Sequence, residues 1–484
     1  MTTELSRPVT DPSPPWPPPI LPPVRYPYRE RGVASRYNIA PVGSGHSALG
    51  RRFWALWTAS LSSGLGDGLV LVAFPLLAAR LSHDARYISG VAVAASLPWL
   101  LFGLPAGVLA DRLDRRRLML GIEVFRAGVL LVLGASVVAG WESLPLLYAT
   151  VFCIGAGQTA FTAAAGVELP RLVRDDQLGR ANGYLLAAET TSEQTIGPAL
   201  GGLLFAAAAA APFVLDGVSF VASAILIGLA VRPKVRHSPG SDRARRVAER
   251  TDTDFVADLR AGWRHFVSDE LLVLLAAVIA VLAFCQAMVL STLVLSALRV
   301  YHVSGVGYGL LWGASAVGGI AGGIVAGRVD ARFGPALTLS ISALIAGFGY
   351  AVIGFTTTGY IAGLGLAVEA VAVTIGNASS MTLRQRIVPD ELRGRVGNII
   401  RWCIFGAIPL GAFTGGLLAQ KQSLRTPFLV AAAVQIVAVS LFAPRLKRQV
   451  HRRLSAVSTD PFGGLDDEPP VARVDTGQSM DRDR

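Results

Sequence analysis

Twelve long apolar runs divide this sequence, and they exclude the folds of ordinary water-soluble proteins. A helix needs about 20 mostly apolar residues to cross the roughly 30 Å hydrocarbon layer of a membrane. Hydrophobic residues make up 52% of the chain and charged residues only 16%, which fits repeated crossings. The sequence therefore predicts an all-α membrane protein with twelve transmembrane helices. The runs lie near residues 53–80, 88–110, 118–140, 144–166, 183–207, 212–231, 271–297, 305–326, 336–355, 360–383, 397–419 and 427–443.

Two pairs of repeated segments divide these runs into equal halves. A short basic turn at residues 107–118 has a counterpart at 327–334, and each turn ends one apolar run and starts the next. A glycine pattern at residues 197–204 recurs at 411–418, at about the same separation of roughly 220 residues. We interpret the chain as two homologous six-helix halves, at 51–231 and 271–444.

Basic residues gather on alternate turns, which predicts the orientation of the chain. By the positive-inside rule, both termini and the middle segment face the cytoplasm of a cell membrane. The proline-rich residues 1–50 and the polar residues 445–484 are expected to be disordered cytoplasmic tails. Residues 232–270 form a linker in which apolar side chains recur at helical spacing, which predicts an amphipathic helix on the membrane surface. These side chains are Phe255, Leu259, Trp263, Phe266 and Val267.

The polar segments exclude several classes of protein. The net charge of +11 is spread over short turns, so nucleic acid is not an expected partner. No phosphate-binding loop, dinucleotide fingerprint, metal-ligand spacing or nucleophile turn occurs, so we expect no ATP, metal or cofactor and no enzyme activity. The lipid bilayer and a small molecule remain as partners of a chain that acts as a monomer.

The first basic turn carries a recognisable motif. It resembles the major facilitator superfamily signature between the second and third helices, although Asp114 replaces a glycine of that signature. In the second half, the small and acidic positions are exchanged as Asp330-Ala331. The resemblance implies a transporter whose cytoplasmic gate is held by these turns and broken by a proton or substrate. The implied gate residues are Gly107, Asp111, Arg112, Arg115, Arg116, Gly327, Asp330 and Arg332.

Further motifs resemble one branch of that superfamily. Gly197-Pro198 and Gly201-Gly202 are similar to the end of the fifth-helix motif of drug:proton antiporters, whose earlier glycines are missing here. The resemblance implies that these residues act as a hinge. Residues 64–68, 216–220 and 389–395 are similar to bacterial macrolide, multidrug and siderophore exporters. This resemblance favours efflux over uptake.

Acidic residues inside apolar runs are candidate proton or substrate sites, because a charge at the bilayer centre costs on the order of 3 kcal/mol. Asp67 should lie near the midplane, where it would bind a proton or a cationic substrate, or else form a structural hydrogen bond. Glu189 and Glu193 are four residues apart, so their carboxylates repel and at least one would hold a proton; a contact of Glu189 with Arg180 is the alternative. Glu369 is a similar candidate in the tenth run.

Other polar residues have weaker assignments. Glu123 and Arg126 are expected to neutralise each other along one helix, and Asp216 is expected to make a cap or packing bond near the outer end of its helix. Five more side chains line the pathway or form hydrogen bonds between helices. They are Gln158, Thr159, Thr162, Gln286 and Asn377.

The sequence thus predicts a secondary transporter that exports a small amphipathic compound, driven by the proton gradient. An uptake or facilitated-diffusion carrier of the same fold is the first alternative. A lipid flippase, or an inactive scaffold whose tails bind a protein, is the second.

Overall fold

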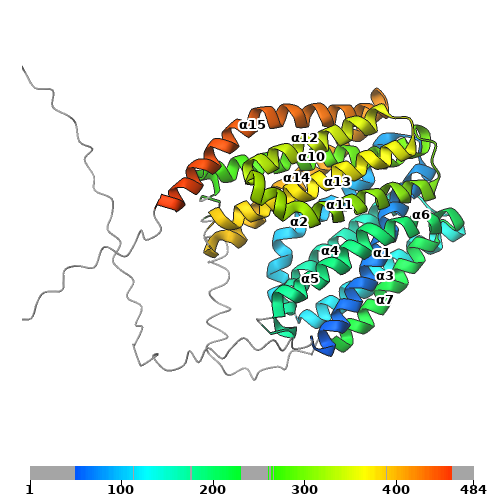
Figure 1. The fold of residues 1–484 in the computed structure, drawn as a ribbon. Helices are drawn as coiled ribbons and strands as arrows, with labels where there is room; N and C mark the ends of the chain where they lie inside the picture. Colours follow the sequence, from blue (N-terminus) through cyan, green and yellow to red (C-terminus); the bar gives the residue numbers. More distant parts are fainter. Residues whose placement is uncertain are drawn as a thin grey trace, which may run out of the picture. The chain divides into compact units, whose positions relative to one another are not determined.

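A computed structural model describes residues 49–112, 114–174, 177–230, 260, 263–264, 266–388 and 390–459. Within these residues the regular secondary structure is entirely helical (Figure 1). The two tails at 1–48 and 460–484 and most of the linker lie outside this range, so their predicted disorder stays a prediction.

The first half comprises six crossings. Its helices are α1 (Arg51–Leu81), α2 (Ala85–Arg112), α3 (Arg115–Ala139), α4 (Leu144–Leu172), a fifth crossing divided into α5 (Leu178–Glu189), the π-helix η2 (Thr190–Ile196) and α6 (Gly197–Ala207), and α7 (Ala211–Ala230). In Figure 1 they lie beside one another in blue to green, with α1 against α7 and α2 against α4.

The second half repeats this plan with unbroken helices. They are α10 (Glu270–Arg299), α11 (Gly305–Phe333), α12 (Pro335–Phe355), α13 (Gly359–Ile387), α14 (Asp390–Lys421) and α15 (Thr426–Thr459). Eleven of the described helices are long and apolar enough to cross a membrane, and the twelfth predicted run is the divided crossing α5–η2–α6. The prediction of twelve helical crossings is confirmed.

Several helices continue beyond the apolar runs that predicted them. α11 runs to Phe333 and α15 to Thr459, whereas their apolar runs end at residues 326 and 443. A helix of 34 residues is about 51 Å long at 1.5 Å per residue, so its polar end projects past the hydrocarbon layer. Residues 445–459, predicted to begin a disordered tail, are therefore helical.

The described part of the linker is helical at Arg260, at 263–264 and at 266–268. Phe266 is buried in a cluster with Leu272 of α10 and Ile400 of α14, whereas Trp263 is exposed. The amphipathic helix itself stays a prediction. Phe255 and Leu259, which begin the predicted pattern, lie outside the described residues.

The two ends of the helix bundle differ in how the halves meet. We call the end with the short α1–α2, α6–α7, α10–α11 and α14–α15 connections the hairpin end, and the opposite end, where α7 stops and α10 starts, the linker end. At the hairpin end the Ala85 amide donates to Gln420 Oε1 over 3.0 Å, and Arg299 Nη1 donates to the His83 carbonyl over 3.2 Å.

Glycines bring the backbones of the two halves together at this same end. A Cβ on Gly202 of α6 would collide with the Gly305 carbonyl of α11, and a Cβ on Gly416 of α14 would collide with Ser89 of α2. Small residues permit such close approach of membrane helices. The hairpin end is therefore closed by direct contact between the halves.

Candidate functional site

A central cavity of about 420 Å³ lies between the two halves. Its volume falls within the roughly 300–1,000 Å³ of small-molecule pockets. Most of its wall is apolar, supplied by α1, α2, α4, α10, α11 and α14. The polar side chains that reach it include Asp67, Ser96, Arg126, Gln158, Glu193 and Gln286. Four predicted site residues thus meet in one cavity: Asp67, Gln158, Glu193 and Gln286.

A buried ion pair joins α1 to α3 at the edge of this cavity. Arg126 Nη2 lies 2.6 Å from Asp67 Oδ1, and the Arg126 side chain is only 1% exposed. The guanidinium also lies over the Phe220 ring, 3.8 Å from its centroid, in a cation–π arrangement. Asp67 therefore has a charged partner on a neighbouring helix.

This pairing corrects the expected Glu123–Arg126 pair. Glu123 is buried, but Arg126 forms its ion pair with Asp67 instead. Helical spacing places Glu123 and Arg126 near one another on α3, but the long arginine side chain reaches across to α1. The sequence spacing alone could not indicate which acid it meets.

Further carboxyl groups surround the pair. Asp216 is fully buried in α7 and accepts a hydrogen bond of 3.0 Å from Ser219 Oγ, the kind of packing bond expected for it. Its carboxyl group fills the space where a Cβ on Gly66 of α1 would lie. The charges of Glu123, Glu193 and Asp216 all interact with Asp67 and Arg126. The first half thus holds four acids whose charges interact, and one of them, Asp67, is paired with Arg126.

The fifth crossing changes its helical geometry beside this cluster. Residues 190–196 form a π-helix, in which the Gly197 amide bonds to the Ser192 carbonyl. Pro198 follows directly and has no amide to donate, so the regular bonding of an α-helix is interrupted there. π-Helical segments are frequent at functional sites. Glu193 lies in this segment and lines the cavity, whereas Glu189 precedes it, is exposed and is not among the lining residues.

The predicted hinge residues lie together at the contact of α1, α6 and α11. A Cβ on Gly197 would collide with Gly68, and one on Gly201 would collide with the Leu69 backbone. Gly202 faces Gly305, and the Pro198 carbonyl lies where a Cβ on Gly309 would be. These glycines permit close packing, and their action as a hinge stays a prediction.

Glu369 lies in the second half behind the cavity wall. It is 3% exposed and accepts hydrogen bonds from Gln286 Nε2 over 3.1 Å and from the Tyr350 hydroxyl over 3.0 Å. Gln286 lines the central cavity, so it links Glu369 to that space. Asn377 is exposed and is not among the lining residues.

We expect Tyr350→Phe to lower the free energy of unfolding by about 1–3 kcal/mol, because it removes one of two donors to the buried Glu369. Thermal unfolding of the purified protein in detergent measures this change. Tyr360→Phe is the matched control, since Tyr360 is 78% exposed and should tolerate the loss of its hydroxyl. Equal stability of the two variants would contradict a structural role for the Tyr350–Glu369 bond.

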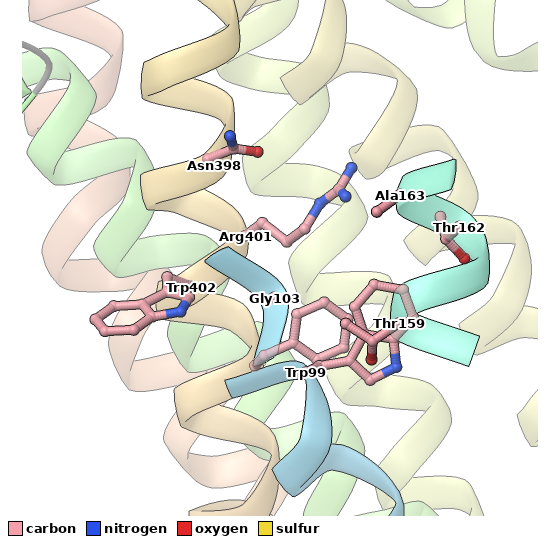
Figure 2. Close-up of a pocket in the computed structure, with 9 residues that line it drawn as sticks. Trp99, Gly103, Thr159, Thr162, Ala163, Asn398, Arg401 and Trp402 are labelled. Carbon is pink, nitrogen blue, oxygen red and sulfur yellow. The ribbon is translucent and has the colours of Figure 1, made fainter. Parts of the chain in front are cut away.

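A smaller pocket of about 90 Å³ shares two wall residues with the central cavity (Figure 2). These residues, Trp99 of α2 and Phe405 of α14, stack with ring centroids 4.8 Å apart and planes 6° apart. Thr159 and Thr162 of α4 also line the small pocket, as does Arg401 of α14. Both threonines were predicted pathway residues, whereas nothing in the sequence pattern indicated the aromatic stack or Arg401.

The gate motif is only partly described. The side chains of Gly107, Asp111, Arg112 and Arg115 lie outside the described residues. Arg116 Nη2 donates to the Gly228 carbonyl over 2.7 Å, which fixes the start of α3 to the last turn of α7. In the second half, Ser379 Oγ of α13 donates to Asp330 Oδ1 over 2.5 Å, while Arg332 and Gly327 are exposed. Asp330 therefore fastens α11 to α13 within its own half.

The hairpin end carries an ion pair between Arg86 and Asp84, with an N–O distance of 2.6 Å. The hydrogen bond from Arg86 holds the pKa of Asp84 below its usual value. In the described part of the chain, no group of three His, Cys, Asp or Glu side chains has an arrangement that could hold a metal ion.

Residues 45–473 match the protein family described as transmembrane secretion effector. Macrolide efflux protein A of Streptococcus pyogenes is 22% identical over 400 residues, which cover 82% of this chain and 96% of that protein. Multidrug efflux pump Tap of Mycolicibacterium fortuitum is 26% identical over 409 residues, which cover 80% of this chain and 95% of that protein.

Solved structures show the same fold. A bacterial homologue of the iron transporter ferroportin in an inward-facing state is 17% identical with a TM-score of 0.65, covering 83% of this chain and 99% of that one. A bacterial homologue of the human lysosomal transporter Spinster, inward-facing and unoccupied, is 16% identical with a TM-score of 0.64, covering 83% and 97%. These proteins are transporters and not enzymes. The chain is a multi-pass membrane transporter, and it belongs to the transmembrane secretion effector family within the major facilitator superfamily.

Proposed function

We propose that this transporter exports a small amphipathic compound across the cytoplasmic membrane in exchange for protons. The central observation is the Asp67–Arg126 ion pair beside a largely apolar cavity, where the charges of Glu123, Glu193 and Asp216 interact with both members of the pair. An excess of carboxyl groups over cations inside a membrane is costly unless protons neutralise it. A site of this composition can therefore exchange a proton for a cationic group of the substrate.

The Asp67–Arg126 pair supplies the coupling step. A proton on Asp67 removes the negative charge that holds Arg126, so the contact between α1 and α3 weakens. α1 packs against η2 and α6, which contact α11 of the other half. Protonation at Asp67 can thus bias the rocking of the two halves around the cavity.

The proposed direction is outward. The named relatives are efflux proteins, and the motifs of residues 64–68 and 216–220 resemble exporters. With both termini in the cytoplasm, as the basic turns indicate, the hairpin end faces the exterior. Contacts between the halves close that end, which corresponds to a state that exchanges substrate with the cytoplasm. The gate residues at the linker end, Asp111 and Arg112 among them, would close the cytoplasmic side in the opposite state.

The test is uphill efflux from cells and inverted vesicles that contain this chain, measured with a panel of dyes, macrolides, tetracyclines and siderophores. We expect an uncoupler to stop uphill efflux. We also expect Glu193→Gln to stop it while leaving downhill movement of the same substrate, because the variant cannot exchange a proton at the cavity wall.

Glu142→Gln is the matched control, since Glu142 lies at the hairpin end of α3 and α4 and is not among the cavity residues. It should retain native uphill efflux. Uphill efflux that persists in the presence of uncoupler would overturn the proton-coupling proposal, and uphill efflux that persists in Glu193→Gln would exclude Glu193 from the proton path. Accumulation instead of efflux would favour an uptake carrier.

A further inference from the structure

The small pocket beside the central cavity has the chemistry of a second ligand subsite. It is formed by both halves, with Trp99, Thr159 and Thr162 from α2 and α4, and Asn398, Arg401 and Trp402 from α14. Its volume of about 90 Å³ suits a carboxylate or a group of similar size. A whole drug-sized molecule needs a pocket of roughly 300 Å³ or more, which the central cavity provides.

Arg401 is the charged donor of this pocket. Figure 2 shows its side chain extending from α14 toward the α4 segment that carries Thr162 and Ala163. Among the described residues, no carboxylate forms an ion pair with Arg401. The charge of Arg384 on α13 interacts unfavourably with that of Arg401. The pocket is therefore positive where the central cavity is acidic.

The wall between the two spaces is aromatic. Trp99 and Phe405 line both cavities, and their stacked rings give the shared wall a flat apolar surface. Flat conjugated ring systems stack on such side chains. An arginine guanidinium offers paired donors that match both oxygens of a carboxylate.

We propose that Arg401 binds the carboxylate of a zwitterionic aromatic substrate whose cationic end is taken by the carboxyl groups of the central cavity. The flat body of this substrate lies against the Trp99–Phe405 stack. The inference rests on the proposed export function, and it adds the class of substrate to it. A purely cationic amphiphile uses only the central cavity and gains nothing from Arg401.

Two xanthene dyes provide matched probes for this assignment. Rhodamine 110 is a zwitterion with a free carboxylate, and rhodamine 123 is its methyl ester, so the dyes share one flat cationic body. Equilibrium binding to the purified full-length chain in lipid nanodiscs is followed by fluorescence polarisation. Because no proton gradient is present, failure of the coupling proposal would leave this measurement unaffected.

We expect the native chain to bind rhodamine 110 more tightly than rhodamine 123. Arg401→Gln should weaken binding of rhodamine 110 by about tenfold and leave rhodamine 123 unchanged, since only the former loses a charge-assisted bond. Arg401→Lys keeps the positive charge and should retain part of the preference for rhodamine 110. This variant therefore distinguishes the effect of the lost charge from a general loss of folding. Arg425→Gln, in the α14–α15 connection at the hairpin end, is the control and should bind both dyes as the native chain does.

Equal or undetectable binding of the two dyes by the native chain would overturn the proposal. So would an equal loss for both dyes in Arg401→Gln, because that result would mean a general disturbance of the pocket.

Discussion

Asp67→Asn is expected to abolish uphill transport and to lower the free energy of unfolding by about 3–5 kcal/mol, because it leaves the buried Arg126 charge without its partner. The side chain keeps its size, so the loss is one of charge. Vesicle efflux measures the first effect, and thermal unfolding in detergent measures the second.

The double variant Asp67→Asn/Arg126→Gln separates the two effects. Removal of the orphaned guanidinium should restore part of the stability, whereas transport should stay lost because the proposed proton site is absent. Asp84→Asn is the control for a carboxylate paired in an exposed position at the hairpin end. It should change stability by less than about 1 kcal/mol. Native uphill transport by Asp67→Asn would refute a coupling role for this pair.

The helices were predictable from sequence because a bilayer imposes a simple requirement on length and polarity. The ends of the helices were less predictable. The last apolar run stops at residue 443, whereas α15 continues to Thr459. A helix that leaves the hydrocarbon layer needs no apolar residues to persist. The apolar pattern indicates where the chain leaves the hydrocarbon layer, and the helix ends farther along the sequence.

The candidate site was predictable only in part. Asp67 and Glu193 could be singled out because an acid in an apolar run is costly and therefore needs a reason. Their surroundings could not be derived in this way. Arg126 has Glu123 at helical spacing in its own helix, yet it bonds to Asp67, because helix rotation and packing decide which side chains meet. The Trp99–Phe405 stack joins residues about 300 positions apart, and no spacing rule connects them.

The fifth crossing shows the same limit in another form. Four-residue spacing places Glu189 and Glu193 on one face of an α-helix, and the π-helix that begins at Thr190 changes that geometry. Pro198 indicated an interruption of the helix. Only the structure shows that the π-helix lies before Pro198 and that Glu193 lines the cavity.

Gly202→Val is expected to reduce transport at least about tenfold by opening the hairpin end. The added side chain would collide with the Gly305 carbonyl, where α6 meets α11 across the closed hairpin end. Overpacking of this kind costs about 1–3 kcal/mol, and the upper part of this range shifts a two-state equilibrium by roughly ten- to a hundredfold away from the closed state.

Cysteine labelling at Ser89 measures the shift in a variant whose Cys153, Cys285 and Cys403 are replaced by alanine. Ser89 is 1% exposed and packs against Gly416 of α14, on a different pair of helices from Gly202, so its reactivity reports opening of the whole end. A membrane-impermeant maleimide applied at the hairpin end should label Ser89→Cys slowly in the native background and at least tenfold faster with Gly202→Val. Gly313→Val introduces the same side chain into α11, where nothing lies within 4 Å of an added Cβ, and should leave labelling slow. Unchanged labelling in Gly202→Val would mean that the α6–α11 contact does not hold this end closed.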